Sequence, residues 1–164
     1  MIAEMNGRNE RLVKLLAEKK LYISSAESCT GGLFSALITD VAGASDVLCE
    51  SIVTYSNEAK MRELGVRSET LEKYGAVSED TACQMAEGIC RHTGADVGVG
   101  ITGIAGPGGG TPQKPVGTVY AGICISGKTE VMHLQLKGSR SEVREQTCAA
   151  VMDRLIELLM LTDS

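Results

Sequence analysis

The sequence is poor in aromatic residues and in positive charge. It has no tryptophan, one phenylalanine and four tyrosines, and 21 acidic residues stand against 16 basic ones, which gives a net charge of −5. Proteins that bind nucleic acid usually carry a basic excess, and those that bind single strands stack the bases on aromatic rings. The composition therefore argues against a nucleic-acid partner.

Segments for export or membrane insertion are also missing. The first twelve residues, MIAEMNGRNERL, contain no apolar signal core, and no segment approaches the roughly 18 apolar residues of a transmembrane helix. Six cysteines in a chain without a signal indicate free thiols in a reducing cytosol. We therefore expect a cytoplasmic protein without a membrane partner.

The sequence gives little support for a metal site. The six cysteines are widely spaced, no CxxC pair occurs, and only two histidines are available. Zinc and iron–sulfur sites typically need closely spaced cysteine or histidine ligands. We expect no metal, and we expect most of the cysteines to be small buried apolar residues.

What is present fits one α/β domain. A chain of 164 residues has the size of a single domain, which we place at residues 1–164. Hydrophobic periodicity predicts helices over 8–20, 30–40, 57–64, 79–93 and 140–161, and strands over 21–25, 50–56, 96–103, 117–126 and 130–137. The last two strands are expected to form a hairpin with a turn at Gly127 and Lys128. Strands separated by helices, followed by a hairpin, predict an α/β fold: a single three-layer α/β/α domain with a mixed β-sheet.

Three segments directly follow predicted strands and no longer have the apolar pattern of a strand: 26–32, 55–60 and 102–117. In α/β sheets, ligands usually bind beyond the carboxyl ends of the strands. If the three strands are parallel, the three turns meet at one edge of the sheet and form the binding place.

The first of these turns carries a candidate nucleophile. The stretch SAESCTGG, residues 25–32, places a serine before a predicted helix, which is ordinary capping chemistry. The glycines that follow weaken a first helical turn, which indicates that something comes close to this backbone. An exposed Ser28 could attack a carbonyl, and the backbone N–H groups near Cys29, Thr30 and Gly31 could stabilise the resulting oxyanion. Gly32 would leave room for the substrate.

The second turn carries a candidate base. In TYSNEAK, Tyr55 ends a strand and Lys60 falls in the first turn of a helix that Asn57 is expected to cap. The helix dipole opposes a positive charge at this position. Burial and the dipole together would lower the pKa of the lysine, as a general base requires. The alternative is an exposed lysine that extends into water.

The third turn is rich in glycine and proline. The stretch TGIAGPGGGTPQKPVG, residues 102–117, holds all three prolines of the chain and six glycines. Long loops in compact domains are often functional, and glycines let a backbone approach a ligand. The candidate substrate contacts in this loop are Thr102, Gly103, Gly106, Gly108 and Gly109. A surface loop without a role is the alternative.

One apparent motif is misleading. GICISGKT, residues 122–129, matches the P-loop pattern G-x-x-x-x-G-K-[ST]. The pattern needs a loop within it and a helix after it, whereas here Ile-Cys-Ile belongs in a strand and the next segment alternates like a strand. We expect a hairpin at this place.

Four stretches together resemble a known family. AESCTGGLFSALITDVAGAS, IVTYSNEAK, GAVSEDTACQMAEGI and GITGIAGPGGGTPQKPVGTVYAGI occur in this order. They resemble the C-terminal domain of the CinA competence/damage-inducible family, and the resemblance extends from about residue 12 to residue 158. It implies a stand-alone member, without the molybdopterin-binding-like domain that precedes this domain in two-domain relatives.

The resemblance implies a nicotinamide-nucleotide amidase of pyridine nucleotide salvage. Such an enzyme hydrolyses the carboxamide of nicotinamide mononucleotide to nicotinate mononucleotide and ammonia, without a metal or organic cofactor, as a homodimer or larger homo-oligomer. The family's nucleophile falls on Ser28, and its activating lysine and tyrosine fall on Lys60 and Tyr55. Lys60 would take the serine proton and pass it to the departing ammonia, and Tyr55 would orient the lysine or relay the proton.

The phosphate of such a substrate needs donors. Besides the glycine-rich loop, Arg140 and Arg144 lie on one helical face at i, i+4 spacing and are candidates, although a solvated face explains them equally well. The family commonly has Gly-Asp-Arg where this chain has Gly138, Ser139 and Arg140, so a carboxylate contact could be lost while helix capping is kept.

Two other classes of function remain open at this stage. Cys29 could serve as the nucleophile, because a helix start lowers the pKa of a thiol. The protein could also be a non-catalytic nucleotide-binding or competence-associated partner.

Overall fold

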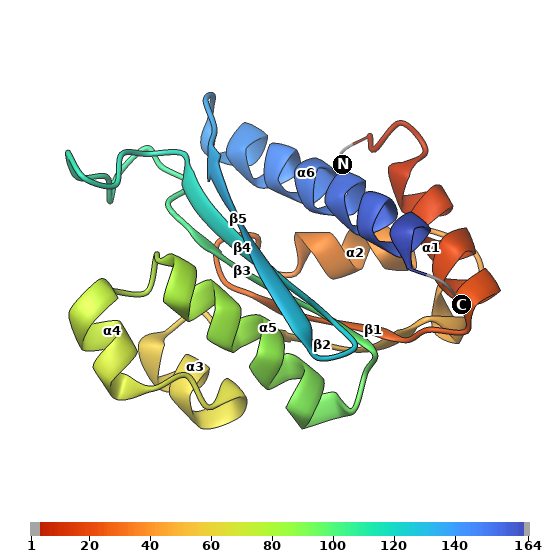
Figure 1. Cartoon of the computed structure of the whole chain (residues 1–164). Coiled ribbons are helices and arrows are strands. Elements are labelled where there is room, and N and C mark those ends of the chain that lie inside the picture. The colour runs from red at the N-terminus through yellow and green to blue at the C-terminus, as the bar shows by residue number, and fades with distance from the viewer. Residues whose placement is uncertain (1–3, 163–164) are drawn as a thin grey trace.

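A five-stranded sheet organises the chain, and the computed structural model describes residues 4–162 of it (Figure 1). The ends of the predicted 1–164 domain, residues 1–3 and 163–164, lie outside this range. In chain order the elements are α1 (Arg8–Lys19), β1 (Ile23–Glu27), α2 (Leu33–Thr39), the 3₁₀ turn η1 (Ala44–Asp46), β2 (Leu48–Val53), α3 (Asn57–Leu64), α4 (Ser68–Tyr74), α5 (Glu79–Thr93), β3 (Val97–Gly103), β4 (Thr118–Ile125), β5 (Lys128–Gln135) and α6 (Arg140–Leu161).

The sheet is mixed, as the sequence predicts. Its strand order is β2-β1-β3-β4-β5. Strand β1 is parallel to both β2 and β3, and β4 is antiparallel to both β3 and β5. The carboxyl ends of β1, β2 and β3 therefore lie at the same edge of the sheet. Since helices cover both faces, the expected three-layer α/β fold is confirmed (Figure 1).

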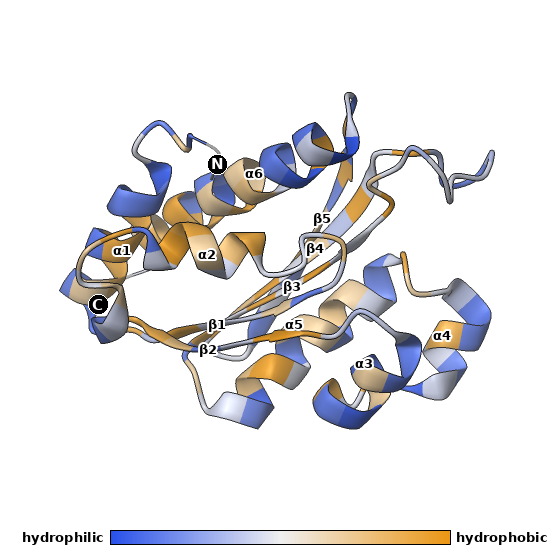
Figure 2. Cartoon of the chain, turned by 180° about the vertical axis from the view of Figure 1, so that it is seen from behind, coloured by the Kyte–Doolittle hydropathy of each residue, from blue (hydrophilic) through white to orange (hydrophobic). Residues whose placement is uncertain are grey.

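Two apolar clusters hold the layers together. The larger one joins the sheet to α1, α2 and α6 on one face, with Leu12, Phe34 and Leu155 fully buried. The smaller one joins Ala26 of the sheet to Leu64 and Met85 on the other face, which α3, α4 and α5 cover. Figure 2 shows hydrophobic residues along α2 and the strands that lie between the layers.

Glycines let α5 approach its neighbours closely. A Cβ at Gly100 of β3 would lie 2.6 Å from the backbone nitrogen of Ala86, so the helix could not pack at this distance on any other residue. On its other side α5 meets α3 at Gly88, where a Cβ would overlap the carbonyl oxygen of Leu64. The position of α3, whose first turn lies in the segment 55–60, thus depends on this contact.

Three predicted strands are displaced. The strand expected at 130–137 is β5 at Lys128–Gln135, because the hairpin turns earlier than predicted. The strand expected at 21–25 is β1 at Ile23–Glu27, because the Leu21 N–H closes α1 on the Leu16 carbonyl. The strand expected at 50–56 is β2 at Leu48–Val53, because the chain already turns toward α3 after Val53.

Details of the helices also differ. Helix α4 is absent from the prediction, since its seven mostly polar residues give only a weak periodic signal. The cap of α3 is Ser56 and not Asn57: the Ser56 hydroxyl accepts the Ala59 N–H at 3.1 Å, and Asn57 is the first helical residue. The second helix begins at Leu33, three residues after the predicted start at 30.

The P-loop-like segment lies in the β4–β5 hairpin, as expected. The hairpin turns at Ser126 and Gly127, whose φ angles of 50° and 83° are left-handed, and Lys128 already pairs with Ile125. The turn is therefore one residue earlier than predicted. Among the helices of the described part of the chain, none is long and apolar enough to cross a membrane.

Candidate active site

The three turns after β1, β2 and β3 surround one pocket of about 290 Å³. It is lined by Ser28, Cys29, Tyr55, Lys60, Ala76, Val77, Thr102, Gly103, Ile104, Ala105, Gly106, Gly108, Gly109 and Arg140. The expected meeting of the turns at one edge is therefore observed. It also brings together every candidate residue of the glycine-rich loop, and Thr102 is held by its hydroxyl, which donates to the Ala76 carbonyl at 2.8 Å.

Ser28 directly follows β1 and is fixed by its backbone. Its N–H donates to the Ile101 carbonyl at 3.0 Å, and the Gly31 N–H donates back to the Ser28 carbonyl at 3.0 Å. Gly31 and Gly32 have φ angles of 57° and 98°, in the left-handed region that other residues rarely adopt. Thr30, Gly31 and Gly32 do not line the pocket, so the two glycines serve the tight turn that presents Ser28 to it, and not the expected contact with substrate.

Lys60 is buried, and its side-chain nitrogen contacts the hydroxyl of Ser28. The residue is only 1% exposed. Its Nζ donates to the carbonyls of Thr54 and Tyr55 at 2.9 and 3.1 Å and to Ser28 Oγ at 3.2 Å. The three acceptors match the three protons of an ammonium group. Among the described residues no carboxylate lies within ion-pair distance of this nitrogen.

The surroundings of Lys60 favour the neutral amine. Burial lowers the pKa of Lys60 from its ordinary value of 10.5, and the nearby Cys29 opposes this only in part. Its place in the first turn of α3 disfavours positive charge as well. A neutral amine would keep its two N–H bonds to the carbonyls of Thr54 and Tyr55, which leaves its lone pair directed toward Ser28 Oγ. The arrangement can accept the serine proton.

Tyr55 contacts Lys60 through its carbonyl oxygen and not through its hydroxyl. Tyr55 is 60% exposed, and its hydroxyl accepts a hydrogen bond from Arg140 at 3.2 Å. The expected relay of a proton by this hydroxyl is therefore not the geometry observed. The backbone of Tyr55 orients the lysine, while its ring and Arg140 form one wall of the pocket.

The two arginine candidates have different surroundings. Arg140 lines the pocket and donates to the Gly106 carbonyl at 2.7 Å. Arg144 does not line the pocket: its guanidinium donates to the carbonyls of Cys29 and Thr30 at 3.1 and 2.8 Å. The expectation that Arg144 could bind a phosphate in the pocket is thus corrected, because its donors support the turn after Ser28.

Cys29 lacks the properties of a thiol nucleophile. It packs in the larger apolar cluster, and burial raises the pKa of its thiol to about 11, so it stays protonated near neutral pH. The lowering expected from a helix start does not occur, because α2 begins only at Leu33. The geometry therefore favours Ser28 over Cys29.

Some backbone N–H groups of the turn after Ser28 already donate hydrogen bonds within the protein, and others could donate to a bound oxyanion. The Gly31 N–H is bonded to the Ser28 carbonyl and the Gly32 N–H to a Glu27 oxygen at 3.2 Å, so neither can serve an oxyanion. Within residues 4–162, neither the Cys29 N–H nor the Thr30 N–H donates to a backbone carbonyl. Of the two residues only Cys29 lines the pocket, while Thr30 is fully buried, so the Cys29 N–H is the candidate oxyanion donor.

Glu27 is the residue of the site that the sequence analysis missed. Its carboxylate is fully buried and accepts hydrogen bonds from the Thr30 hydroxyl at 2.7 Å and from the N–H groups of Phe34 and Ser35 at 3.0 and 3.1 Å. It thereby ties the start of α2 to the end of β1. An acidic residue at the end of a buried strand, followed by a serine–glycine turn, is the signal that could have identified it.

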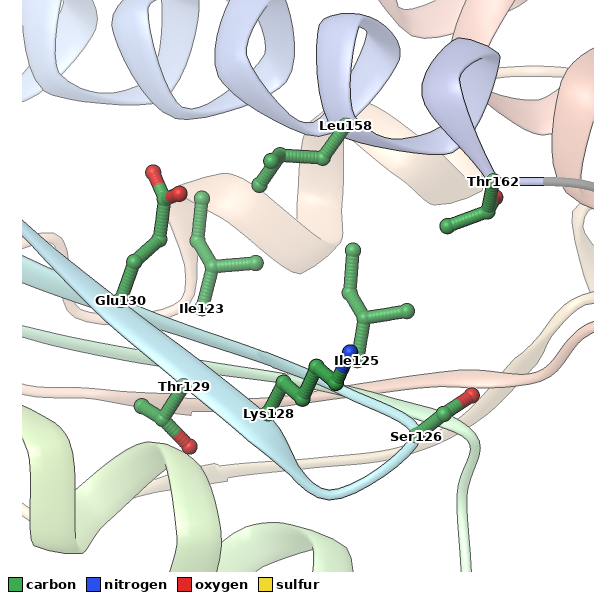
Figure 3. Close-up of a pocket in the computed structure, with 8 residues that line it drawn as sticks. All are labelled: Ile123, Ile125, Ser126, Lys128, Thr129, Glu130, Leu158 and Thr162. Atoms are coloured by element: carbon green, nitrogen blue, oxygen red, sulfur yellow. The ribbon is translucent and has the colours of Figure 1, made fainter.

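A larger pocket of about 420 Å³ lies at the opposite edge of the sheet (Figure 3). It is bordered by aliphatic side chains such as Ile123, Ile125 and Leu158, and its one carboxylate, Glu130, is paired with Arg154 at 2.6 Å. Its lining residues include no buried lysine in contact with a serine, unlike the pair of Lys60 and Ser28 in the smaller pocket. Across the chain as far as it is described, no group of three or more His, Cys, Asp and Glu side chains could hold a metal ion.

Comparison with protein families gives one match over nearly the whole chain. The family model described as the CinA C-terminal domain matches residues 6–159. Among curated proteins, the CinA-like protein of Kosmotoga olearia is 55% identical over 144 residues, which are 88% of this chain and 35% of that protein. The putative competence-damage inducible protein of Clostridium acetobutylicum is 55% identical over 139 residues, 85% of this chain and 34% of that protein. The chain thus spans about a third of the length of these relatives.

Solved structures agree with the fold. The competence/damage inducible protein CihA from Agrobacterium tumefaciens superposes with a TM-score of 0.93 at 38% identity, covering 96% of this chain and 98% of that one. The competence damage-inducible protein A from Klebsiella pneumoniae gives a TM-score of 0.94 at 31% identity, covering 98% and 100%. These names refer to competence and damage and specify no chemical activity.

Proposed function

The chain belongs to the CinA C-terminal domain family, and we propose that it is a nicotinamide-nucleotide amidase that uses Ser28 and Lys60. The reaction is hydrolysis of the carboxamide of nicotinamide mononucleotide to nicotinate mononucleotide and ammonia. The observation that carries the proposal is the buried Lys60 Nζ at 3.2 Å from Ser28 Oγ, on the wall of a pocket.

In the first half-reaction Ser28 Oγ attacks the carboxamide carbon while its proton passes to the neutral Lys60 Nζ. The negative charge on the carboxamide oxygen is stabilised by the N–H group of Cys29, which lines the pocket. Lys60 then gives the proton to the amide nitrogen, the carbon–nitrogen bond breaks, and ammonia leaves. The nicotinoyl group remains on Ser28 as an ester.

In the second half-reaction a water molecule attacks the ester carbon and gives a proton to Lys60. The bond to Ser28 Oγ breaks, Lys60 returns the proton to that oxygen, and nicotinate mononucleotide is released. Arg140 and the N–H groups of the loop at Gly106, Gly108 and Gly109 are the candidate donors for the phosphate, since all of them border the pocket.

Three further expectations belong to this proposal. The enzyme needs no metal or organic cofactor, it acts in pyridine nucleotide salvage in the cytoplasm, and it works as a homodimer or larger homo-oligomer. Light scattering of the purified protein measures the last of these directly.

The decisive experiment is ammonia release. Purified protein is incubated with nicotinamide mononucleotide in excess chelator, and ammonia and nicotinate mononucleotide are quantified together. We expect stoichiometric formation of both products. Binding of the nucleotide without product formation would replace the amidase by a non-catalytic nucleotide-binding protein, and activity that returns only with an added divalent ion would contradict the metal-free mechanism.

A further inference from the structure

Tyr55 contacts a proposed catalytic group with one end and a proposed phosphate donor with the other. Its carbonyl accepts from Lys60 Nζ at 3.1 Å, and its hydroxyl accepts from Arg140 at 3.2 Å. We propose that the ring of Tyr55 binds the positively charged pyridinium ring of the substrate and thereby favours cationic carboxamides over neutral ones. The inference rests on the proposed amidase function, since it concerns how that site recognises its nucleotide.

The pyridinium ring carries a permanent positive charge that the pocket must accommodate. Its nitrogen is bonded to the ribose and has no proton to lose, so the charge is present at every pH. Among the described residues that line the pocket, none is an aspartate or a glutamate. The nearby Glu27 does not line it, and its carboxylate already binds donors of the turn and of α2. The pocket wall therefore offers the pyridinium no carboxylate partner.

Tyr55 is the one aromatic residue among the described residues that line the pocket. The face of an aromatic ring carries partial negative charge and attracts a cation. Aliphatic lining residues such as Val77 and Ile104 can pack against a flat ring, but they attract a charged ring no more than a neutral one. Tyr55 is thus the residue of the wall that can distinguish the two.

The position of Tyr55 corresponds to the part of the substrate between its two ends. The carboxamide carbon must lie at Ser28 Oγ, which is 3.2 Å from the same Lys60 Nζ that contacts the Tyr55 carbonyl. The phosphate is proposed to lie at Arg140, which holds the Tyr55 hydroxyl. The pyridinium is bonded directly to the carboxamide carbon and is joined to the phosphate through the ribose. A substrate that extends from Ser28 to Arg140 therefore passes along Tyr55.

The two basic residues of the pocket do not oppose a cationic ring at this place. Burial favours the neutral amine of Lys60, which adds no positive charge beside the pyridinium. The charge of Arg140 is matched by the phosphate. The bond from Arg140 also restrains the Tyr55 side chain before substrate binds, so less conformational entropy is lost on binding.

The contact should act on binding and not on the chemical step. The pyridinium charge is the same in the bound substrate and in the transition state, because the reaction takes place at the carboxamide. An interaction of equal strength in both states changes KM and leaves kcat unaltered. The backbone carbonyl that holds Lys60 is kept in every Tyr55 variant. Loss of the ring should therefore raise KM, whereas loss of a proton relay through the hydroxyl would lower kcat.

The experiment compares Tyr55→Leu, which removes the ring, with Tyr55→Phe, which removes only the hydroxyl. The matched control is Tyr22→Leu, since Tyr22 is 50% exposed and does not line the pocket. The ligands are nicotinamide mononucleotide and its neutral isostere, benzamide riboside monophosphate, in which a ring carbon replaces the charged nitrogen. Turnover of nicotinamide mononucleotide gives kcat and KM for each protein. Calorimetry in the Ser28→Ala background gives Kd for both ligands without turnover, and melting temperature verifies the fold.

We expect the ratio of the two Kd values, neutral over cationic, to fall roughly three- to 30-fold when Tyr55→Leu is introduced. Tyr55→Phe and Tyr22→Leu should keep most of the ratio. Both Tyr55 variants lose the bond to Arg140, but this loss affects the two phosphorylated ligands alike and cancels in the ratio. Should Tyr55→Leu fail to fold, Tyr55→Met removes the ring with a more flexible side chain.

Three results would overturn the inference: an unchanged ratio in Tyr55→Leu, an equal loss of the ratio in Tyr55→Phe, or a fall in kcat at constant KM in Tyr55→Leu. The binding assay keeps the two proposals apart. If the wild-type protein releases no ammonia but the ratio falls in Tyr55→Leu, the amidase proposal fails and the role of Tyr55 stands. Ammonia release with an unchanged ratio gives the reverse result, and binding of neither ligand would overturn the role of Tyr55 as well.

Discussion

Lys60 Nζ lies 3.2 Å from Ser28 Oγ, although 32 positions separate the two residues in the sequence. The contact exists because β1 and β2 are parallel neighbours, so the turn after one lies beside the turn after the other. The lysine is buried without a carboxylate partner in the described structure, which is a costly arrangement unless the amine is neutral.

The identity of the nucleophile is the first prediction. Ser28→Ala should reduce the hydrolysis of nicotinamide mononucleotide by roughly 10⁴-fold or more, because no other nucleophile takes its place. Cys29→Ala should keep most of the activity, since its thiol has a pKa of about 11 and stays protonated. Ammonia release is measured for both variants, with thermal melting to verify the fold. An active serine variant beside an inactive cysteine variant would show that the assignment is reversed.

The second prediction concerns the charge state of Lys60. Arginine keeps a positive charge but cannot act as a base, and methionine keeps the length without charge or basicity. We expect Lys60→Arg and Lys60→Met to be nearly inactive. The wild-type kcat/KM should rise with pH through the lowered pKa of Lys60, because only the deprotonated amine can activate Ser28. Near-normal activity of the arginine variant would mean that Lys60 acts as a fixed charge.

The third prediction is thermodynamic and does not depend on activity. Burial lowers the pKa of Lys60 in the folded protein below 10.5, so between these two pKa values the unfolded chain binds more protons than the folded one. The free energy of unfolding of the wild type, relative to Lys60→Met, should therefore rise with pH and level off above about 10.5. Each pKa unit of lowering corresponds to about 1.4 kcal/mol. Urea denaturation of both proteins at several pH values measures the difference, and a difference that stays constant or falls with pH would refute the lowered pKa.

The fourth prediction tests recognition of the phosphate by Arg140. Nicotinamide riboside lacks the phosphate, so kcat/KM for the mononucleotide should be at least about tenfold higher, in line with ~1.5–3 kcal/mol for a charge-assisted hydrogen bond. Arg140→Met should remove most of this preference by raising KM for the mononucleotide while leaving the riboside nearly unaffected. Arg154→Met is the matched control. If Arg140→Met lowers the rate on both substrates equally, Arg140 supports the pocket wall and does not bind the phosphate.

The sequence was sufficient for the fold class and for the residues whose type is unusual at their position. Lys60 stands out because a lysine in a first helical turn opposes the dipole, and Ser28 stands out because two glycines follow it so closely. Both features are local, so they can be recognised without the structure. The meeting of the three turns also followed from the expected parallel order of the strands.

The supporting residues could not be inferred in the same way. Arg144 is 114 residues from Thr30, and its surface-like spacing on a helix gives no hint that it binds backbone carbonyls. Glu27 is a charged residue whose burial depends on donors from α2 and from the turn before it, which fold against it. The true cap of α3 was missed because Ser56 and Asn57 are equally good capping residues, and only the course of the chain after β2 decides between them.

Gly88 acts as a spacer for the site, although it touches neither the pocket nor Ser28. The backbone of α3 rests on it at Leu64, and the same helix carries Lys60 one turn from its start. Any side chain at position 88 would push the two helices apart and lengthen the path of a proton between Lys60 and Ser28. The reactivity of the serine is thus coupled to a helix-to-helix distance in the smaller apolar cluster, so changes in that cluster can tune the rate without altering a single residue that meets the substrate.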